Sequence, residues 1–340
     1  MLDRSTRTAI SRGTALVELL VVIVIMSILV AAVLPGIQPA LEDRKIREAS
    51  RQVNAYFAKA RARAAEIDRP VAVVFERVAA GRNDSYQIFL AESPQMYTGD
   101  TLGATAAVST VAGWSGAAWQ TKVSFAPNTL ITVAKQPGES IVCKPGDLIR
   151  FDYRGRWYQV DSVHNPTATD IIIKSSEMPP EPPPVIQASP ATRSMRFQIQ
   201  RQPEKSGETP LQLPTGTVVD LGLSGFGSSG TEFNVGGDIP VVITFEADGT
   251  VSQVSYGDGA GNVLRGTPLA PIYFMIGRQD KVGAAQPADS NLADLNNLWV
   301  AVNPQTGLVT TSDNGFDPSG AQTLAESREF ARKAEAVGGR

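Results

Sequence analysis

The chain contains almost no cysteine or histidine. Cys143 is its one cysteine and His164 its one histidine among 340 residues. A single cysteine excludes an intrachain disulfide, and such a residue is more often a small buried apolar side chain than a nucleophile. One histidine leaves little basis for an imidazole metal site or a histidine-based catalytic triad. Enzymes that depend on either arrangement are therefore poor candidates.

The chain also lacks a strong excess of either charge. It has 31 Lys and Arg against 34 Asp and Glu, for a net charge of -3. This balance gives no reason to expect nucleic acid as a partner. A content of 42% hydrophobic and 19% charged residues is typical of a globular protein. The 30 glycines and 23 prolines predict many turns in a strand-rich body.

One long apolar run lies near the N-terminus. The 21 residues from Thr14 to Leu34 read TALVELLVVIVIMSILVAAVL and contain one charged residue, Glu18. This length matches the roughly 20 residues that cross a bilayer as a helix. An acid near the membrane centre costs about 2.5–3.5 kcal/mol, so Glu18 requires a functional explanation. Arginines before the run predict a cytoplasmic N-terminus and an exported body.

Three kinds of N-terminal segment can be compared with this run. A cleaved secretory signal has an apolar core of roughly 7–15 residues and a small-x-small site, and neither feature fits. A plain signal anchor fits the length but explains neither Glu18 nor the Arg12-Gly13 junction. In a prepilin-type leader, a polar segment ends in a glycine and the apolar run starts at once. The residues 1–13, MLDRSTRTAISRG, fit this third kind.

The segment GTALVELLVVIVIMSILVAAVLP, from Gly13 to Pro35, resembles the N-terminal signature of type IV pilins and type II secretion pseudopilins. Thr14 stands where that family usually has phenylalanine. The resemblance implies that a prepilin peptidase cleaves between Gly13 and Thr14 and methylates the new amino group of Thr14. It also implies that Glu18 is the assembly acid, which pairs with the amino terminus of a neighbouring subunit. The alternative for Glu18 is an acid that reaches the membrane interface near the helix start.

Pro35, together with Gly36 and Pro39, predicts a helix break after the apolar run. An amphipathic continuation is expected over residues 35–69, because apolar residues recur there at three- and four-residue steps. This stripe consists of Leu41, Ile46, Ala49, Val53, Phe57, Ala60, Ala64 and Ile67. Its charged residues of both signs predict a solvated face rather than a nucleic-acid surface.

The period changes after residue 70, and short strands separated by turn signals are expected. The candidate strands are Val71–Phe75, Tyr86–Leu90, Thr121–Phe125, Leu130–Ala134, Asp147–Tyr153, Trp157–Val163, Asp170–Lys174, Arg196–Gln200, Thr217–Leu221, Val241–Glu246, Thr250–Val254, Ile272–Ile276, Leu298–Val302 and Leu308–Thr310. Three segments, REASRQVNAYFAKARARAAEIDRPVAVVF, VVITFEADGTVS and LWVAVNPQTGLVTT, are similar to H-type (FimT-like) minor pseudopilins.

The expected fold class is α+β, with a long N-terminal helix packed on a mostly antiparallel, β-sandwich-like body. The expected parts are a leader (1–13), a transmembrane segment (14–34), the helix continuation (35–69), a β-rich globular domain (70–320) and a helical tail (321–340). Within the domain we expect a β insertion over 140–175 and a proline-rich loop over 177–194. The insertion could equally belong to one enlarged sandwich. For the tail, a frayed helix is favoured over a docking element.

Other motifs have simpler structural explanations. Residues 225–230 satisfy G-x-G-x-x-G, but no helix pattern follows, which favours a flexible loop over a dinucleotide site. Asp248 and Asp258 lie near glycines and could ligate calcium, but turn formation is the better interpretation. Asp152, Asp161 and Asp170 are scattered carboxylates without a recognisable partner. No metal, cofactor or catalytic group is therefore expected.

These observations favour a structural protein over an enzyme. The first hypothesis is a minor pseudopilin of a type II secretion system, and the second is a minor type IV pilin. A third, from another class, is a membrane-anchored periplasmic ligand-binding protein. The pilin hypotheses imply prepilin peptidase, other pilins or pseudopilins, an inner-membrane assembly platform, membrane lipid and secreted cargo as partners, without nucleic acid. They imply a single-pass inner-membrane location, with the N-terminus cytoplasmic and the body periplasmic.

Overall fold

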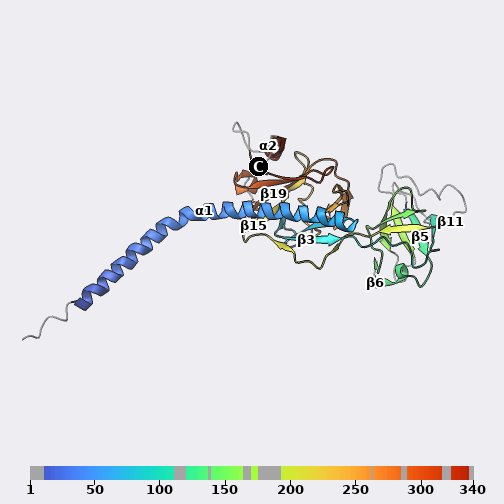
Figure 1. Ribbon diagram of the computed structural model, residues 1–340, viewed down its shortest axis with the longest axis horizontal. Helices are drawn as coiled ribbons and strands as arrows, with labels where there is room; N and C mark the ends of the chain where they lie inside the picture. Colours follow the sequence, from blue (N-terminus) through green and yellow to red (C-terminus); the bar gives the residue numbers. More distant parts are fainter. Residues whose placement is uncertain are drawn as a thin grey trace, which may run out of the picture.

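The computed structural model describes residues 11–110, 120–136, 139–163, 170–174, 193–261, 263–284, 289–315 and 323–336. In the N-terminal helix, the side chains described are those of residues 16–31 and 41–67. His164, nearly all of the leader and most of the proline-rich loop lie outside the described residues. Figure 1 shows a long helix lying on a β body, with a smaller β unit beyond its far end.

Helix α1 (Ser11–Ile67) packs on the body through the predicted apolar stripe. Ile46, Ala49, Val53, Phe57, Ala60 and Ala64 are all buried, which confirms the stripe over this part. Leu41, at its start, is 49% exposed. The helix ends where Asp68 adopts a left-handed conformation (φ 51°), a common C-terminal stop, with Pro70 two residues later.

A first antiparallel sheet runs in the order β13 (Glu204–Lys205), β3 (Gln87–Glu92), β1 (Val71–Glu76), β16 (Val241–Phe245), β17 (Val251–Gly257) and β18 (Val263–Gly266), with β14 (Leu211–Gln212) also beside β3. Strand β1 lies at the centre, since Val73 faces Leu90 on one side and Ile243 on the other. Because β1 is covered on both faces, it is a continuous apolar run rather than an alternating one.

A second antiparallel sheet has the order β2 (Asp84–Ser85), β15 (Thr217–Phe226), β19 (Ile272–Arg278), β20 (Leu298–Val302) and β21 (Val309–Asp313). One core joins α1 to both sheets. At its centre the ring of Phe57 lies 5.8 Å from that of Phe75, 5.9 Å from that of Phe245 and 5.9 Å from that of Phe274. The docked half of α1 is thus an integral part of this core.

A separate β unit has its own core. Its sheet has the order β11 (Arg193–Met195), β4 (Ala106–Thr110), β5 (Gln120–Phe125), β10 (Asp170–Lys174), β9 (Tyr158–Val163), β8 (Leu148–Phe151) and β12 (Phe197–Gln200). A small sheet of β6 (Ala134–Gln136) and β7 (Glu139–Ser140) accompanies it. The unit is larger than the insertion predicted over 140–175, because strands on both sides of that range complete the sheet.

Helix α2 (Leu324–Ala336) is docked, not frayed as expected. Its Ala331 is buried in a cluster with Tyr273, Met275 and Trp299. The Trp299 Nε1–H donates to Ser327 Oγ at 2.7 Å. The guanidinium of Arg328 donates to the carbonyls of Leu223 and Gly227 at 2.8 and 2.9 Å. The helix is therefore anchored by buried polar contacts as well as apolar ones.

Most predicted strands are present within two or three residues of their predicted ends. Asp170–Lys174 and Leu298–Val302 match β10 and β20 at both ends. The predicted strand Leu130–Ala134 is wrong, because Leu130–Thr132 forms the 3-10 helix η1. Its start is fixed by polar contacts: Thr129 N–H donates to Thr132 Oγ1, and Leu130 N–H donates to Asp100 Oδ2. A polar cap therefore overrides the β propensity of this apolar segment.

Two further predictions are corrected by the structure. The α+β class with one sandwich-like body is wrong, because the fold is mostly β and its antiparallel sheets surround two separate cores. No helix in the described part of the chain is long and apolar enough to cross a membrane. This finding overturns the single-pass inner-membrane location.

Candidate assembly surface and the cavity beside helix α1

The N-terminal part of α1 presents an apolar surface that has no partner among the described residues. Its large apolar side chains are between 47% and 68% exposed, from Leu16 at 68% to Val30 at 56%. A helix that is apolar on all sides is normally buried among other elements. In Figure 1 this part of α1 extends away from the body, and no described element covers it. It is therefore a candidate surface for other helices.

The predicted site residues lie at the start of this surface. Gly13 and Thr14 are within the helical backbone of α1, and their side chains are not described. Glu18 is exposed, with Val17 and Leu19 as apolar neighbours at 62% and 63% exposure. Pro35 also lies where side chains are not described. The backbone of α1 is helical through Pro35, so the helix break predicted there is wrong, although α1 changes direction before it reaches the body (Figure 1).

An ion-pair cluster fixes α1 where it meets the body. Arg278, at the end of β19, has its Nη1 2.6 Å from Glu42 Oε2 of α1. Asp43 Oδ1 lies 3.8 Å from Nη2 of the same guanidinium. Asp294 completes the cluster, with its Oδ2 3.5 Å from Arg278 Nε and 2.8 Å from Lys281 Nζ. Burial acts to raise the pKa of Asp294, but the hydrogen bond from Lys281 and the nearby cations outweigh it and lower the pKa.

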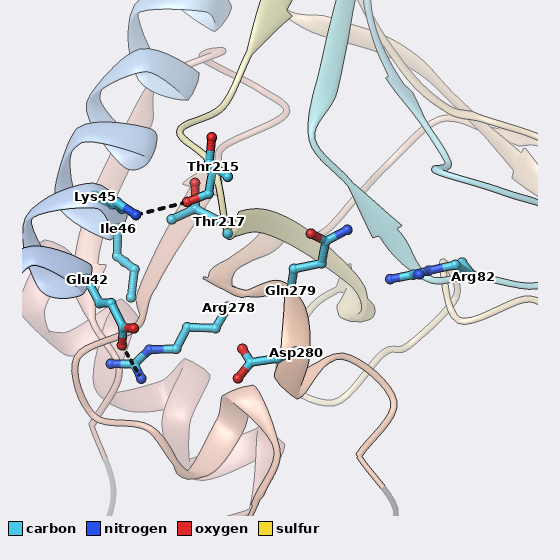
Figure 2. Close-up of a pocket in the computed structure, with 10 residues that line it drawn as sticks. Glu42, Lys45, Ile46, Arg82, Thr215, Thr217, Arg278, Gln279 and Asp280 are labelled. Atoms are coloured by element: carbon cyan, nitrogen blue, oxygen red, sulfur yellow. Dashed lines mark hydrogen bonds and ion pairs between the residues drawn. The ribbon is translucent and has the colours of Figure 1, made fainter. Parts of the chain in front are cut away.

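A cavity of about 530 Å³ lies beside this cluster, between α1 and the second sheet (Figure 2). Its lining includes Glu42, Lys45, Thr217, Arg278 and Asp280. Lys45 Nζ donates to the Thr215 carbonyl at 3.2 Å, which ties a second position of α1 to the start of β15. Glu42 and Arg278 thus face the cavity as an ion pair. This arrangement suits positioning of the helix and provides no nucleophile with an adjacent base.

Sequence reasoning did not identify Arg278 or Asp294. Their partners lie in α1 and in separate loops, so no local spacing connects them. The one available signal is that Glu42 and Asp43 begin the docked half of α1, where a cation on the body would be needed.

The other candidate residues have structural roles. Asp248 accepts hydrogen bonds from Thr250 N–H at 2.9 Å and Thr250 Oγ1 at 2.7 Å, as a turn residue does. The Gly225–Gly230 segment begins inside β15 and continues as a turn, with the Gly230 N–H donating to the Phe226 carbonyl. It is an ordered strand end and not the flexible loop that we expected. Asp170 pairs with Lys122 at 2.7 Å.

Cys143 is 2% exposed, and burial raises the pKa of its thiol well above the ordinary value. It therefore has the character of a small apolar core residue. Within the described residues, no group of three or more His, Cys, Asp or Glu side chains is arranged to hold a metal ion.

Comparisons with protein families, with curated proteins and with solved structures find no significant match to this chain.

Proposed function

We propose that the chain is a structural subunit of a pilin-type filament, specifically a minor pseudopilin of a type II secretion system. The observation that carries the proposal is the surface from Leu16 to Val30, whose apolar side chains are exposed around the helix. Full burial of one such side chain contributes about 1.5–3 kcal/mol. Packing of several α1 helices against one another would therefore supply a large driving force. The proposed role is assembly and not catalysis.

The division of α1 into two parts supports this role. Its second half is held in the core by Phe57 and its neighbours, and the Arg278 cluster fixes the point where it leaves the body. A subunit built in this way presents its apolar helix in a defined direction. The β units would then lie on the outside of a helical filament. The proposal rests on packing between subunits and requires no membrane-spanning helix.

Glu18 has a specific role in this arrangement. A carboxylate among apolar helices is costly unless a cation pairs with it. Cleavage between Gly13 and Thr14 would create a positive amino terminus four residues before Glu18. The amino terminus of one subunit could then pair with Glu18 of its neighbour. The sequence signature and the exposed position of Glu18 support this pairing.

The test compares Glu18→Ala with Glu48→Ala, a matched control that removes an exposed acid from the docked half of α1. We expect both variants to be cleaved, with methyl-Thr14 as the mature terminus by mass spectrometry. Glu18→Ala should be absent from sheared filaments, whereas Glu48→Ala should be present at the wild-type level. Normal incorporation of Glu18→Ala, or a wild-type terminus that remains at Met1, would contradict the proposal.

A further inference from the structure

A second hollow lies in the separate β unit, where strands β8 and β9 diverge. The two strands pair only at Leu148↔Gln159 and Ile149↔Tyr158, whereas β8 continues to Phe151 along β12. The chain between Phe151 and Tyr158 therefore leaves the sheet and borders a hollow of about 640 Å³. This volume is within the range of about 300–1,000 Å³ that is usual for sites of small organic ligands.

The hollow has an apolar floor and a basic rim. Phe151, Tyr158 and Met195 line it and are each 5% exposed. Arg154, Arg156 and Arg196 line its exposed side, and Asp152 is the one acid among the lining residues. Arg154 and Arg196 outnumber the one carboxylate of Asp152, which gives the rim a net positive charge. A ligand that fills this hollow should therefore be anionic at one end and apolar at the other.

Two of these arginines have charges that the described part of the chain leaves unpaired. The side chains of Arg154 and Arg196 are exposed, and neither forms an ion pair or a hydrogen bond with a described residue. Arg150, close by, differs because it donates to Gln198 at 2.6 Å and lies 4.5 Å from the Trp157 ring centre. A guanidinium offers paired N–H donors that match carboxylate, sulfonate and phosphate oxygens.

The backbone at the rim is held in an uncommon conformation. Asp152 and Tyr153 have φ of 52° and 59°, and the Arg154 N–H donates to the Phe151 carbonyl at 3.2 Å. These values fit a type I′ turn, which is costly for a bulky residue such as tyrosine. The Asp152 N–H donates to the Arg196 carbonyl at 2.7 Å and ties the turn to Arg196, which lies between β11 and β12. The two parts of the rim are thus fixed relative to each other.

We propose that this hollow binds an organic anion. The apolar body of the ligand would rest on Phe151, Tyr158 and Met195, and its carboxylate, sulfonate or phosphate would be held by Arg154 and Arg196. The proposal concerns the separate β unit alone and does not depend on filament assembly.

The test uses the full chain and two fluorescent probes that differ in one charged group. The anionic probe is 8-anilinonaphthalene-1-sulfonate, and the neutral one is N-phenyl-1-naphthylamine. Both will bind weakly to the exposed part of α1, so the saturable component is the quantity to compare. We expect Arg154→Gln/Arg196→Gln to weaken saturable binding of the sulfonate by about tenfold or more, as loss of charge-assisted hydrogen bonds predicts.

The matched control is Arg44→Gln/Arg51→Gln, which removes the same charge from exposed positions of α1. It should leave the affinity within about twofold, since these arginines are distant in sequence and lie on another element. Arg154→Lys/Arg196→Lys should restore part of the affinity, because it keeps the charge but not the paired N–H donors. Equal weakening by both Gln pairs, no weakening by either, or equal affinity for the neutral and anionic probes would overturn the proposal.

Discussion

Asp147 is a carboxylate inside the separate β unit, and its surroundings make it sensitive to pH. It is 1% exposed and accepts hydrogen bonds from the Lys144 and Gln202 N–H groups, each at 2.9 Å. Burial raises its pKa to about 6 from an ordinary value of 3.8, although these hydrogen bonds act in the opposite direction. The folded state therefore binds a proton more readily than the unfolded state does.

Because the pKa of Asp147 is higher in the folded state, protonation of Asp147 stabilises the fold at low pH. The contribution of Asp147 to stability is greatest below pH 3.8, falls as pH rises to about 6 and stays low above that value. Between pH 5 and pH 7.5 the loss is about 1 kcal/mol for this group. We expect Asp147→Asn to lack this loss, as measured by denaturant unfolding at the two pH values. Asp152→Asn, at an exposed position of the same unit, should keep it. An identical pH dependence in wild type and Asp147→Asn would contradict the expectation.

At the scale of elements, α2 depends on one buried cation. Arg328 is fully buried, donates to two backbone carbonyls and lies 5.1 Å from the Trp299 ring centre and 5.3 Å from that of Tyr273. Burial lowers its pKa to about 10, so it remains charged at neutral pH. Its removal would leave the carbonyls of Leu223 and Gly227 without these donors, at a cost of about 1–3 kcal/mol for each buried group.

We therefore expect Arg328→Ala to release α2 while the two cores stay folded. The tail should become sensitive to limited proteolysis, and the emission of Trp299 should move to longer wavelength as its ring meets water. Arg332→Ala is the matched control, because Arg332 lies one turn later and is exposed. Protection from protease equal to wild type in Arg328→Ala would show that α2 stays docked without the hydrogen bonds of Arg328.

Sequence periodicity predicted the buried face of α1 and most strands, but it did not predict the docking of α2. The spacing of Ile46, Val53 and Phe57 indicated the buried face of α1, because a helical repeat is a local property. Strand positions followed from alternating or continuous apolar runs in the same way. The docking of α2 could not be predicted, since Arg328 has its partners in β15, β19 and β20. Glu18 became a candidate because it belongs to a local sequence motif. The residues of the Arg278 cluster are distant in sequence, so the cluster could be recognised only in the structure.

At the scale of the whole molecule, the separate β unit is inserted between two paired strands. The chain leaves β3 at Glu92, forms the unit and returns at Glu204 of β13, and these two residues are register partners. An isolated bridge between Tyr97 and Ile199 lies just inside the unit. The entry and exit are thus side by side, and each unit buries its own apolar core. Such a connection lets one unit unfold without opening the other.

We expect denaturant unfolding to occur in two steps, one for each core. Ile243→Ala should destabilise the step that belongs to α1 and the first two sheets, and Ile149→Ala the step of the inserted unit. Both isoleucines are fully buried, so each change should cost about 2–5 kcal/mol in its own core. Near-UV circular dichroism and tryptophan fluorescence can follow the two steps, because Trp299 lies in β20 of the second sheet and Trp157 in the inserted unit. A single transition that both substitutions shift equally would mean that the two cores are energetically coupled. The paired strands β3 and β13 would then couple the unfolding of the two cores.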